Sequence, residues 1–212
     1  EDPVEYQMDR VNQVQINVQA GFTFATALRS VLRQDPNVVM VGEIRDLETA
    51  ELAIRTALTG HLVLSTLHTN DAAGAVTRLV DMGIEPFLIS SSLLSVVAQR
   101  LVRLVCPLCK MEAQPIPQPF DALGIPAEQR PERIHVGRGC VACGNTGYSG
   151  RAGVYEVLDM DDELRRAILD RSDSVVIRRI AMQHGMMRMV EDGMEKVRAG
   201  MTTPEEVLRS VY

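Results

Sequence analysis

Two short apolar runs in the first third of the chain each end in polar residues that could bind phosphate or a metal ion. The run VVMV at 38–41 is followed by GEIRD, and the run LVL at 62–64 is followed by STLHTND. Such runs around a helical segment are typical of buried parallel strands joined by a crossover helix. Ligands of open α/β sheets bind beyond the carboxyl ends of the strands. We therefore expect Glu43, Thr66 and His68 to form a phosphate and metal edge.

The segment between the two runs has the features of that crossover helix. Asp46 is a suitable N-cap, Leu47 and Ile54 belong to an apolar face at helical spacing, and Gly60 is a suitable end. A second interpretation stays open on this pattern alone. An acidic residue after a strand, such as Glu43, is often only part of a helix start.

All four cysteines of the chain lie in two C-x-x-C motifs, Cys106-Pro-Leu-Cys109 and Cys140-Val-Ala-Cys143. Two such motifs supply four thiolates, which suit a closed, structural Cys₄ zinc site. The alternatives are disulfides, which a reducing cytosol disfavours, or a redox pair, which needs only one motif. The intervening segment shows little helical periodicity, and we expect the metal to hold it in order. Its prolines are Pro115, Pro117, Pro119, Pro126 and Pro131.

The remaining patterns predict mostly helices. Residues 12–18 alternate in polarity, which predicts a half-buried strand. Helices are predicted over 24–32 and 71–83, and the apolar window 86–105 is predicted to be a buried helix. A strand is expected over 151–158 and helices over 161–170, 174–184 and 186–199, with a last helix opened by the capping box Thr203-Pro204-Glu205-Glu206. Four methionines are expected in the core, namely Met186, Met189, Met194 and Met201.

Composition limits the function classes. The chain has 212 residues, 46% of them hydrophobic, which is enough for one or two domains with a sizeable core. A formal net charge of −6 argues against sequence-independent binding to nucleic acid. The window 86–105 contains two arginines and several polar residues, which argues against a membrane span, and no signal peptide is visible.

Three motifs together resemble a known family. VVMVGEIRD resembles the atypical Walker B box of the secretion ATPase superfamily, GHLVLSTLHTND resembles its His box, and the opening EDPVEY resembles its Asp box. The similarity continues through DMGIEPFLISSSLLSVVAQRLVRLVCPLCK to the C-terminus. Within the superfamily, the chain is most similar to the type II secretion ATPases (the E component), with type IV pilus assembly ATPases next.

The resemblance implies an α/β, RecA-like P-loop NTPase core with a Cys₄ zinc subdomain and a helical C-terminal domain. The implied boundaries are 1–104, 105–150 and 151–212. Nothing in the sequence matches the glycine loop G-x-x-x-x-G-K-[ST]. In the family that loop precedes the Asp box, so we expect this chain to be a fragment that starts just after it and to be inactive alone.

The resemblance also implies roles for individual residues, with ATP, Mg²⁺ and Zn²⁺ as cofactors. Glu43 would hold Mg²⁺ through water, because Gly42 stands where many P-loop proteins have aspartate. Glu1 is the candidate base for the attacking water, and Asp2 a weaker nucleotide-binding candidate. His68 is the candidate sensor of the γ-phosphate, with Thr66 nearby. Asp2 could instead start a turn.

Two residues of these motifs are harder to assign. His61 belongs to the His box by resemblance, which makes it a nucleotide-binding candidate. It precedes the strand, however, so an extended strand places it about 20 Å or more from His68. A packing role or a subunit contact is the alternative for His61. Arg45 could pair with Asp46 or with a neighbouring chain.

The function implied is a cytoplasmic ATPase motor at the bacterial inner membrane that powers type II secretion by assembling a pilus-like fibre. The implied partners are five further copies in a homohexamer and the inner-membrane platform and cytoplasmic-linker proteins of the secretion system. A type IV pilus assembly motor is the alternative within the family. A noncatalytic zinc-stapled adaptor is the alternative from another class, but it leaves Glu43 and His68 without a role.

Overall fold

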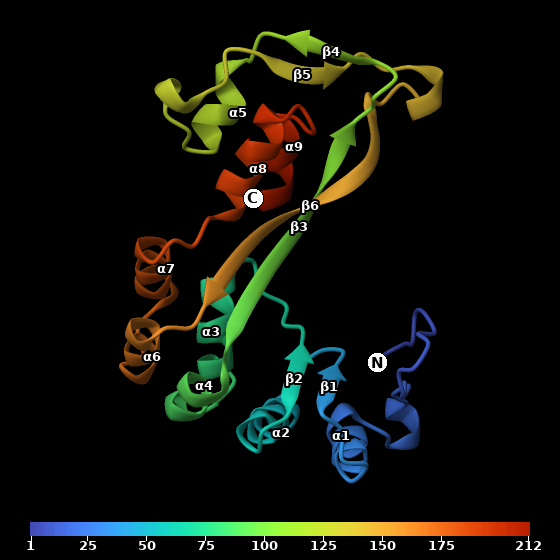
Figure 1. Ribbon diagram of the computed structural model, residues 1–212, viewed down its shortest axis with the longest axis vertical. Helices are drawn as coiled ribbons and strands as arrows, with labels where there is room; N and C mark the ends of the chain where they lie inside the picture. The colour runs from blue at the N-terminus through green and yellow to red at the C-terminus, as the bar shows by residue number, and fades with distance from the viewer. The chain divides into compact units, whose positions relative to one another are not determined.

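Two parallel strands, β1 (Val38–Val41) and β2 (Leu62–Ser65), are joined by helix α2 (Leu47–Leu58) (Figure 1). The register pairs Val38 with Leu62 and Val41 with Ser65, so the residues that follow both strands emerge at one edge. Asp46 caps α2, because its Oδ1 accepts a hydrogen bond from the Thr49 amide at 2.8 Å. The predicted strands and crossover helix are therefore present.

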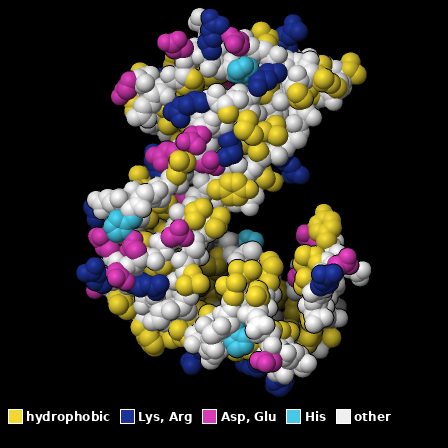
Figure 2. Space-filling view, in the orientation of Figure 1, with side chains coloured by type: hydrophobic (Ala, Val, Ile, Leu, Met, Phe, Trp, Pro, Cys, Tyr) yellow, Lys and Arg dark blue, Asp and Glu magenta, His cyan; other side chains and the backbone are white.

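One face of this sheet is exposed, whereas the sequence led us to expect strands buried on both faces. Val38 and Met40 are 55% and 59% exposed, while their neighbour Val41 is buried. Leu62 and Leu64 lie on the same bare face, and hydrophobic side chains gather over these strands in Figure 2. Successive side chains of a strand point to opposite faces, and within this chain only one face is covered by helices. The apolar composition of these two strands therefore did not predict correctly that both of their faces are buried within this chain.

The structure, a computed structural model, describes residues 1–212, which fold as two units. The first unit consists of Glu1–Val96 and Asp159–Ala181, and the second of Val97–Leu158 and Met182–Tyr212. These two units are defined by which residues lie close together in space. The domain boundaries at 104 and 150 are based on sequence motifs and stay a prediction. Besides β1, α2 and β2, the first unit contains η1 (Val18–Ala20), α1 (Phe24–Leu32), α3 (Ala72–Asp81), α4 (Pro86–Ser92), α6 (Asp162–Leu169) and α7 (Ser174–Gln183).

The strand predicted over 12–18 is wrong. Only Asn17 forms a bridge there, with Phe22, and the short helix η1 begins at Val18. The amide of Ile16 instead donates to the Glu1 carbonyl at 2.9 Å. The alternation of polar and apolar residues correctly predicted that Ile16 is buried, but no neighbouring strand pairs with residues 12–18.

The single helix predicted over 86–105 is also wrong. Helix α4 ends at Ser92, Leu93 adopts an extended conformation with ψ 127°, and strand β3 runs over Ser95–Val105. β3 pairs with β6 (Tyr148–Asp159). Valines at 96, 97, 102 and 105 favour a strand, because β-branched side chains lose χ1 freedom in a helix. No helix of the described chain has the length and apolar character needed to cross a membrane.

The second unit has its own hydrophobic core. Its remaining elements are β4 (Lys110–Ala113), α5 (Pro117–Ala122), η2 (Ala127–Gln129), β5 (Ile134–Gly137), η3 (Val141–Cys143), α8 (Met189–Arg198) and α9 (Pro204–Val211). β4 and β5 are antiparallel, with Lys110 opposite Gly137. The core residues are Val102, Phe120, Leu123, Ile125, Ile134, Val154, Val190, Met194, Val197 and Val207.

This core adds to the expected role of a metal in ordering the proline-rich segment. Phe120 of α5 is fully buried, and Leu123, Ile125 and Ile134 pack into the same cluster. Burying a phenylalanine side chain contributes about 1.5–3 kcal/mol. The segment between the cysteine motifs is therefore anchored by apolar burial as well.

Helices α8 and α9 pack closely. A Cβ on Gly193 would meet Val207 Cγ1 at 2.6 Å, so glycine is required at this crossing. The methionine expectation holds for Met186, Met189 and Met194, which are buried, but Met201 is 41% exposed. Helical spacing did not apply to Met201, because it follows the end of α8 at Arg198.

A buried carboxylate links α9 to β3. The hydroxyl of Thr203 accepts from the Glu206 amide as the capping box predicts, but the Glu206 side chain turns away from the cap. Its Oε2 accepts from Arg103 Nε at 2.8 Å and from Arg209 Nη2 at 2.8 Å. Burial by itself would raise the pKa of Glu206, but the hydrogen bonds and charge of Arg103 lower it overall.

We expect Glu206→Gln to destabilise the second unit by about 1–2 kcal/mol at pH 7. The value lies below that for a fully buried pair because Arg103 is 39% exposed. A lowered pKa in the folded chain means that this stabilisation is complete above the ordinary glutamate pKa of about 4.3 and is lost as the pH falls through the folded value. Urea unfolding should therefore show a difference from the unsubstituted chain that shrinks below about pH 4.

Glu205→Gln, one residue away on the exposed side of α9, is the matched control and should change stability little at any pH. A pH-independent difference for Glu206→Gln would contradict the assignment of the effect to the charge.

Candidate functional site

Glu43 and His68 meet at the edge where β1 and β2 end. The Nε2 atom of His68 lies 3.1 Å from Glu43 Oε2, and Arg45 Nε donates to the same oxygen at 2.5 Å. Glu43 is 9% exposed, whereas the side chains of Arg45 and His68 are mostly exposed. The hydrogen bond from Arg45 lowers the pKa of Glu43, and that from His68 adds to the effect, against a smaller opposing effect of burial. The carboxylate is therefore held ionised.

Backbone and side-chain bonds join the two turns that carry these residues. The amide of Ile44 donates to the Thr66 carbonyl at 3.0 Å, and Thr66 Oγ1 donates to the Gly42 carbonyl at 2.7 Å. These bonds continue the parallel pairing beyond Val41 and Ser65. Thr66 thus joins the two turns in this structure, and the sheet edge presents a carboxylate, an imidazole and a guanidinium together.

The backbone of Glu1 lies beside Gly42. A Cβ on Gly42 would meet Glu1 Cα at 3.4 Å and the Phe24 ring at 3.6 Å. The Glu1 carboxylate accepts a hydrogen bond from Gln13 Nε2 at 2.9 Å, so Gln13 orients it. Asp2 is exposed. Glu1 therefore lies at the same sheet edge, although Glu1 and Glu43 have separate partners.

His61 lies apart from this group. Its Nδ1 is 3.2 Å from the Thr56 carbonyl and 3.1 Å from Thr59 Oγ1, at the C-terminal end of α2. Its place before β2 is the one that strand geometry predicts. Sequence reasoning overlooked Gln13 as a partner of Glu1 and the pairing of Arg45 with Glu43. The second had a signal, because residues two apart in an extended segment project to the same side.

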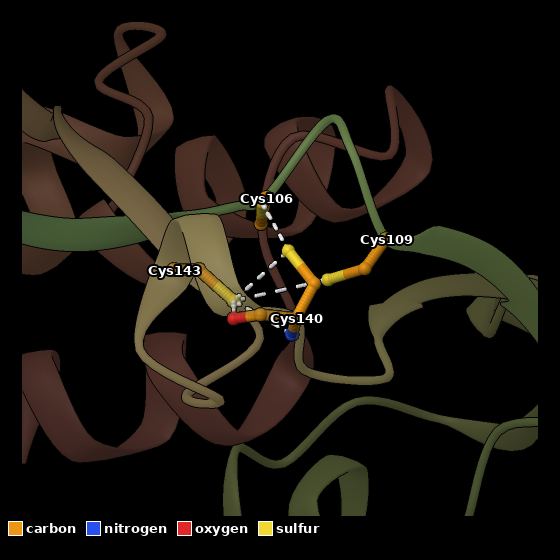
Figure 3. A group of neighbouring side chains, drawn as sticks. All are labelled: Cys106, Cys109, Cys140 and Cys143. Atoms are coloured by element: carbon orange, nitrogen blue, oxygen red, sulfur yellow. Dashed lines mark hydrogen bonds between the residues drawn. The ribbon is translucent and has the colours of Figure 1, made fainter.

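The four cysteines form a compact cluster in the second unit. Their sulfur atoms lie within 4.8 Å of one another and point toward a common centre (Figure 3). The Cys106–Cys140 and Cys109–Cys143 sulfur distances are both 3.9 Å, and Cys140–Cys143 is 3.7 Å. Thiolates bound to one tetrahedral zinc ion at about 2.3 Å stand about 3.8 Å apart, whereas a disulfide requires about 2.05 Å. The cluster could therefore bind one metal ion, and its cysteines are not paired as disulfides.

Backbone amides approach the sulfur of Cys143. The amides of Cys140 and Gly147 donate to Cys143 Sγ at 3.2 and 3.3 Å. A Cβ on Gly137 would meet the Gly147 carbonyl oxygen at 2.0 Å, so two glycines allow this close approach. Burial raises the pKa of Cys143, but these amide hydrogen bonds, together with the side-chain contacts with Cys140 and Cys109, outweigh it and lower the value to about 6. Burial raises the pKa of Cys109 to about 11.

In the metal-free chain, Cys143 should be alkylated before Cys109 at pH 7, because the thiolate is the reactive form. The measurement is iodoacetamide labelling after chelation, followed over time by peptide mass spectrometry. Equal rates at both sites would contradict the amide stabilisation of Cys143. Labelling in unfolding concentrations of urea is the control and should remove the difference.

Known proteins resemble this chain over nearly its whole length. Residues 1–209 match the family described as Type II/IV secretion system protein. The chain is 54% identical over 209 residues to the type IV pilus assembly ATPase PilB of Thermus thermophilus, covering 98% of the chain and 24% of that protein. It is 53% identical over 210 residues to the type II secretion system protein E of Pseudomonas aeruginosa, covering 99% of the chain and 41% of that protein.

The fold is similar to that of a solved relative. The structure of the pilus retraction motor PilT with bound ADP superposes with a TM-score of 0.69 at 28% identity, covering 99% of this chain and 50% of PilT. The chain thus spans between 24% and 41% of the length of these curated relatives. Its α/β fold, its sequence motifs and the match over 1–209 together show that the chain belongs to the Type II/IV secretion system protein family.

Proposed function

We propose that this chain is part of an ATPase that powers type II secretion through ATP-driven assembly of a pilus-like fibre. The observation that carries the proposal is the meeting of Glu43 and His68, 3.1 Å apart, where two parallel strands end. Relatives at about half identity bear the names of a pilus assembly ATPase and a type II secretion ATPase, which supports the same activity.

The site residues suit nucleotide chemistry. Mg²⁺ would neutralise charge on the β- and γ-phosphates of ATP. Glu43 is an ionised, nearly buried carboxylate that can hold the ion's water shell, and the exposed His68 imidazole can donate to a γ-phosphate. Glu1 is the proposed base for the attacking water, oriented by Gln13. Asp2 and Thr66 are weaker nucleotide-binding candidates.

His61 is assigned a supporting role in this proposal. Its contacts with Thr56 and Thr59 place it at the end of α2, where it can fix the start of β2. Arg45 is the counter-ion of Glu43 in this structure, and a cation bound at Glu43 would compete with it.

A RecA-like core needs more than the two parallel strands described. We propose that a phosphate-binding glycine loop, further strands of this sheet and the helices that cover the exposed face of Val38 and Met40 belong to the longer protein. The motif-based domains 1–104, 105–150 and 151–212 remain part of the proposal, with a zinc ion at the four cysteines. The whole protein would act as a cytoplasmic homohexamer on inner-membrane platform and cytoplasmic-linker proteins.

Type IV pilus assembly is the second candidate. The 54% identity to PilB supports it as strongly as the 53% identity to the secretion protein supports secretion. The site chemistry is common to both, so genetic complementation decides between them. A noncatalytic adaptor is the remaining alternative, and it leaves the Glu43–His68 pair unexplained.

We expect Glu43→Gln in the full-length protein to lower kcat about 100-fold or more, because the amide cannot hold a divalent cation as a carboxylate does. The measurement is steady-state phosphate release at saturating Mg²⁺ and ATP. Glu48→Gln, in the exposed first turn of α2, is the matched control and should retain activity. A folded full-length protein without turnover would favour the adaptor.

We expect one zinc ion per chain, lost in Cys106→Ser, as measured by elemental analysis. Val141→Ala is the control, because Val141 lies inside the second cysteine motif but is 94% exposed. Chelation should lower the melting temperature by about 5–10 °C without unfolding the second unit, since Phe120 and its neighbours remain buried. Unchanged melting in a metal-loaded sample after chelation would contradict a structural metal.

A further inference from the structure

An ion pair joins the turn that carries His68 to helix α7. Arg178 Nη2 donates to Asp71 Oδ2 at 2.6 Å, although 106 residues lie between them in the sequence. Asp71 follows His68 by three residues and is the N-cap of α3, where its Oδ1 accepts from the Gly74 amide at 2.7 Å. Each carboxylate oxygen of Asp71 therefore makes a separate contact. Oδ1 caps the N-terminus of α3, and Oδ2 accepts the hydrogen bond from Arg178 of α7.

The helix cap does not require Arg178. An N-cap aspartate satisfies the first amides of its helix with one oxygen, and asparagine serves equally well. The second contact thus adds a constraint from a distant segment. Both side chains are largely shielded, with Asp71 27% and Arg178 33% exposed, so the pair is less screened by solvent than a fully exposed one.

An open pocket lies beside the helices that this ion pair joins. Its volume is about 380 Å³, and it is lined by the C-terminal half of α3 and by the α6–α7 turn, with Val76, Val80, Ile168, Ser172 and Ile177 among its lining residues. Close-packed interiors resist displacement, whereas an open cavity removes those contacts on both sides. Beside this pocket, a charge-assisted hydrogen bond ties α7 to the start of α3, next to the buried Ile177.

The short turn between His68 and Asp71 is itself stabilised from within. Thr69 Oγ1 donates to the Asp71 carbonyl at 3.2 Å, and the Thr69 amide donates to the Leu67 carbonyl. Only Thr69 and Asn70 separate His68 from Asp71, so a displacement of Asp71 would reach His68 through this short turn. His68 in turn is the partner of Glu43 at the sheet edge.

We infer that Arg178 is a positioning residue, which through Asp71 sets where His68 stands relative to Glu43. The inference rests on the proposed function, because it gives helix α7 control over the residue that would contact the γ-phosphate. A movement of α6 and α7 that breaks the pair would release the His68 turn. Conversely, a ligand bound at His68 would strengthen the pair, since coupling between two sites is reciprocal.

Hydrogen exchange in the full-length protein tests the positioning directly. In Arg178→Gln, amide exchange across residues 66–74 should rise about fivefold, the size expected for loss of a partly shielded ion pair. Asp71→Asn keeps the helix cap but loses the charge and should give the same rise. Arg179→Gln, on the exposed side of the same helix, is the matched control and should change nothing there.

Amides of β1 and the melting temperature serve as references for global stability. If exchange across 66–74 is unchanged in both Arg178→Gln and Asp71→Asn, the inference is wrong. An increase that extends equally to β1 would also overturn it, because the effect would then be general destabilisation. These outcomes are independent of catalysis, so they remain decisive even if the full-length protein proves to lack ATPase activity.

ATP turnover tests whether Arg178 acts through His68. In Arg178→Gln, kcat should fall about fivefold with little change in KM, and Arg178→Lys should recover part of the loss. In a His68→Ala background, the further change Arg178→Gln should have no additional effect, because residues that act as one unit are not additive. An undiminished fivefold effect in that background would place the action of Arg178 elsewhere.

Discussion

The parallel register of β1 and β2 is the constraint on which the candidate site depends. Val41 lies opposite Ser65, so the chain leaves both strands at one edge, and Glu43 and His68 can meet. The bonds from Ile44 and Thr66 extend this pairing into the turns. In a strand pair, a shift of one residue would turn each side chain to the other face. The register therefore places the carboxylate and the imidazole together, and the helix caps at Asp46 and Asp71 then fix where each turn ends.

The second unit combines two kinds of stabilisation. Apolar burial around Phe120 orders the proline-rich segment, while the four cysteines gather where the 106–109 and 140–147 turns approach each other. Sulfur atoms that lie 3.7–3.9 Å apart have the separation that one tetrahedral ion requires. The amides at Cys143 stabilise negative charge before any ion binds. A metal would thus add to an existing fold, unlike in small zinc domains that have no core of their own.

Local patterns predicted most elements because their causes are local. The helices α1, α2, α3, α6, α7 and α9 have caps and apolar stripes that can be read directly, and the strands β1, β2 and β6 follow apolar runs or alternation. Where the prediction was wrong, a distant partner decided the outcome. The window 86–105 has enough hydrophobic residues for a helix, yet β6 supplies the hydrogen bonds that make Ser95–Val105 a strand. Residues 12–18 alternate like a strand but pair only with Glu1 and Phe22.

The sequence alone determined the candidate residues of the sheet edge, the four cysteines and the family, because these depend on residue type and short spacing. Tertiary structure decided which of them meet. The tertiary structure brings Glu43 into contact with His68 and Arg45. It places His61 at the end of α2, and it lets Gln13 donate a hydrogen bond to the Glu1 carboxylate. It also joined Asp71 to Arg178, a contact between two charged residues that no local pattern distinguishes from ordinary surface charges. Contacts of this range depend on how helices and strands pack in three dimensions, and spacing along one chain carries no record of that packing.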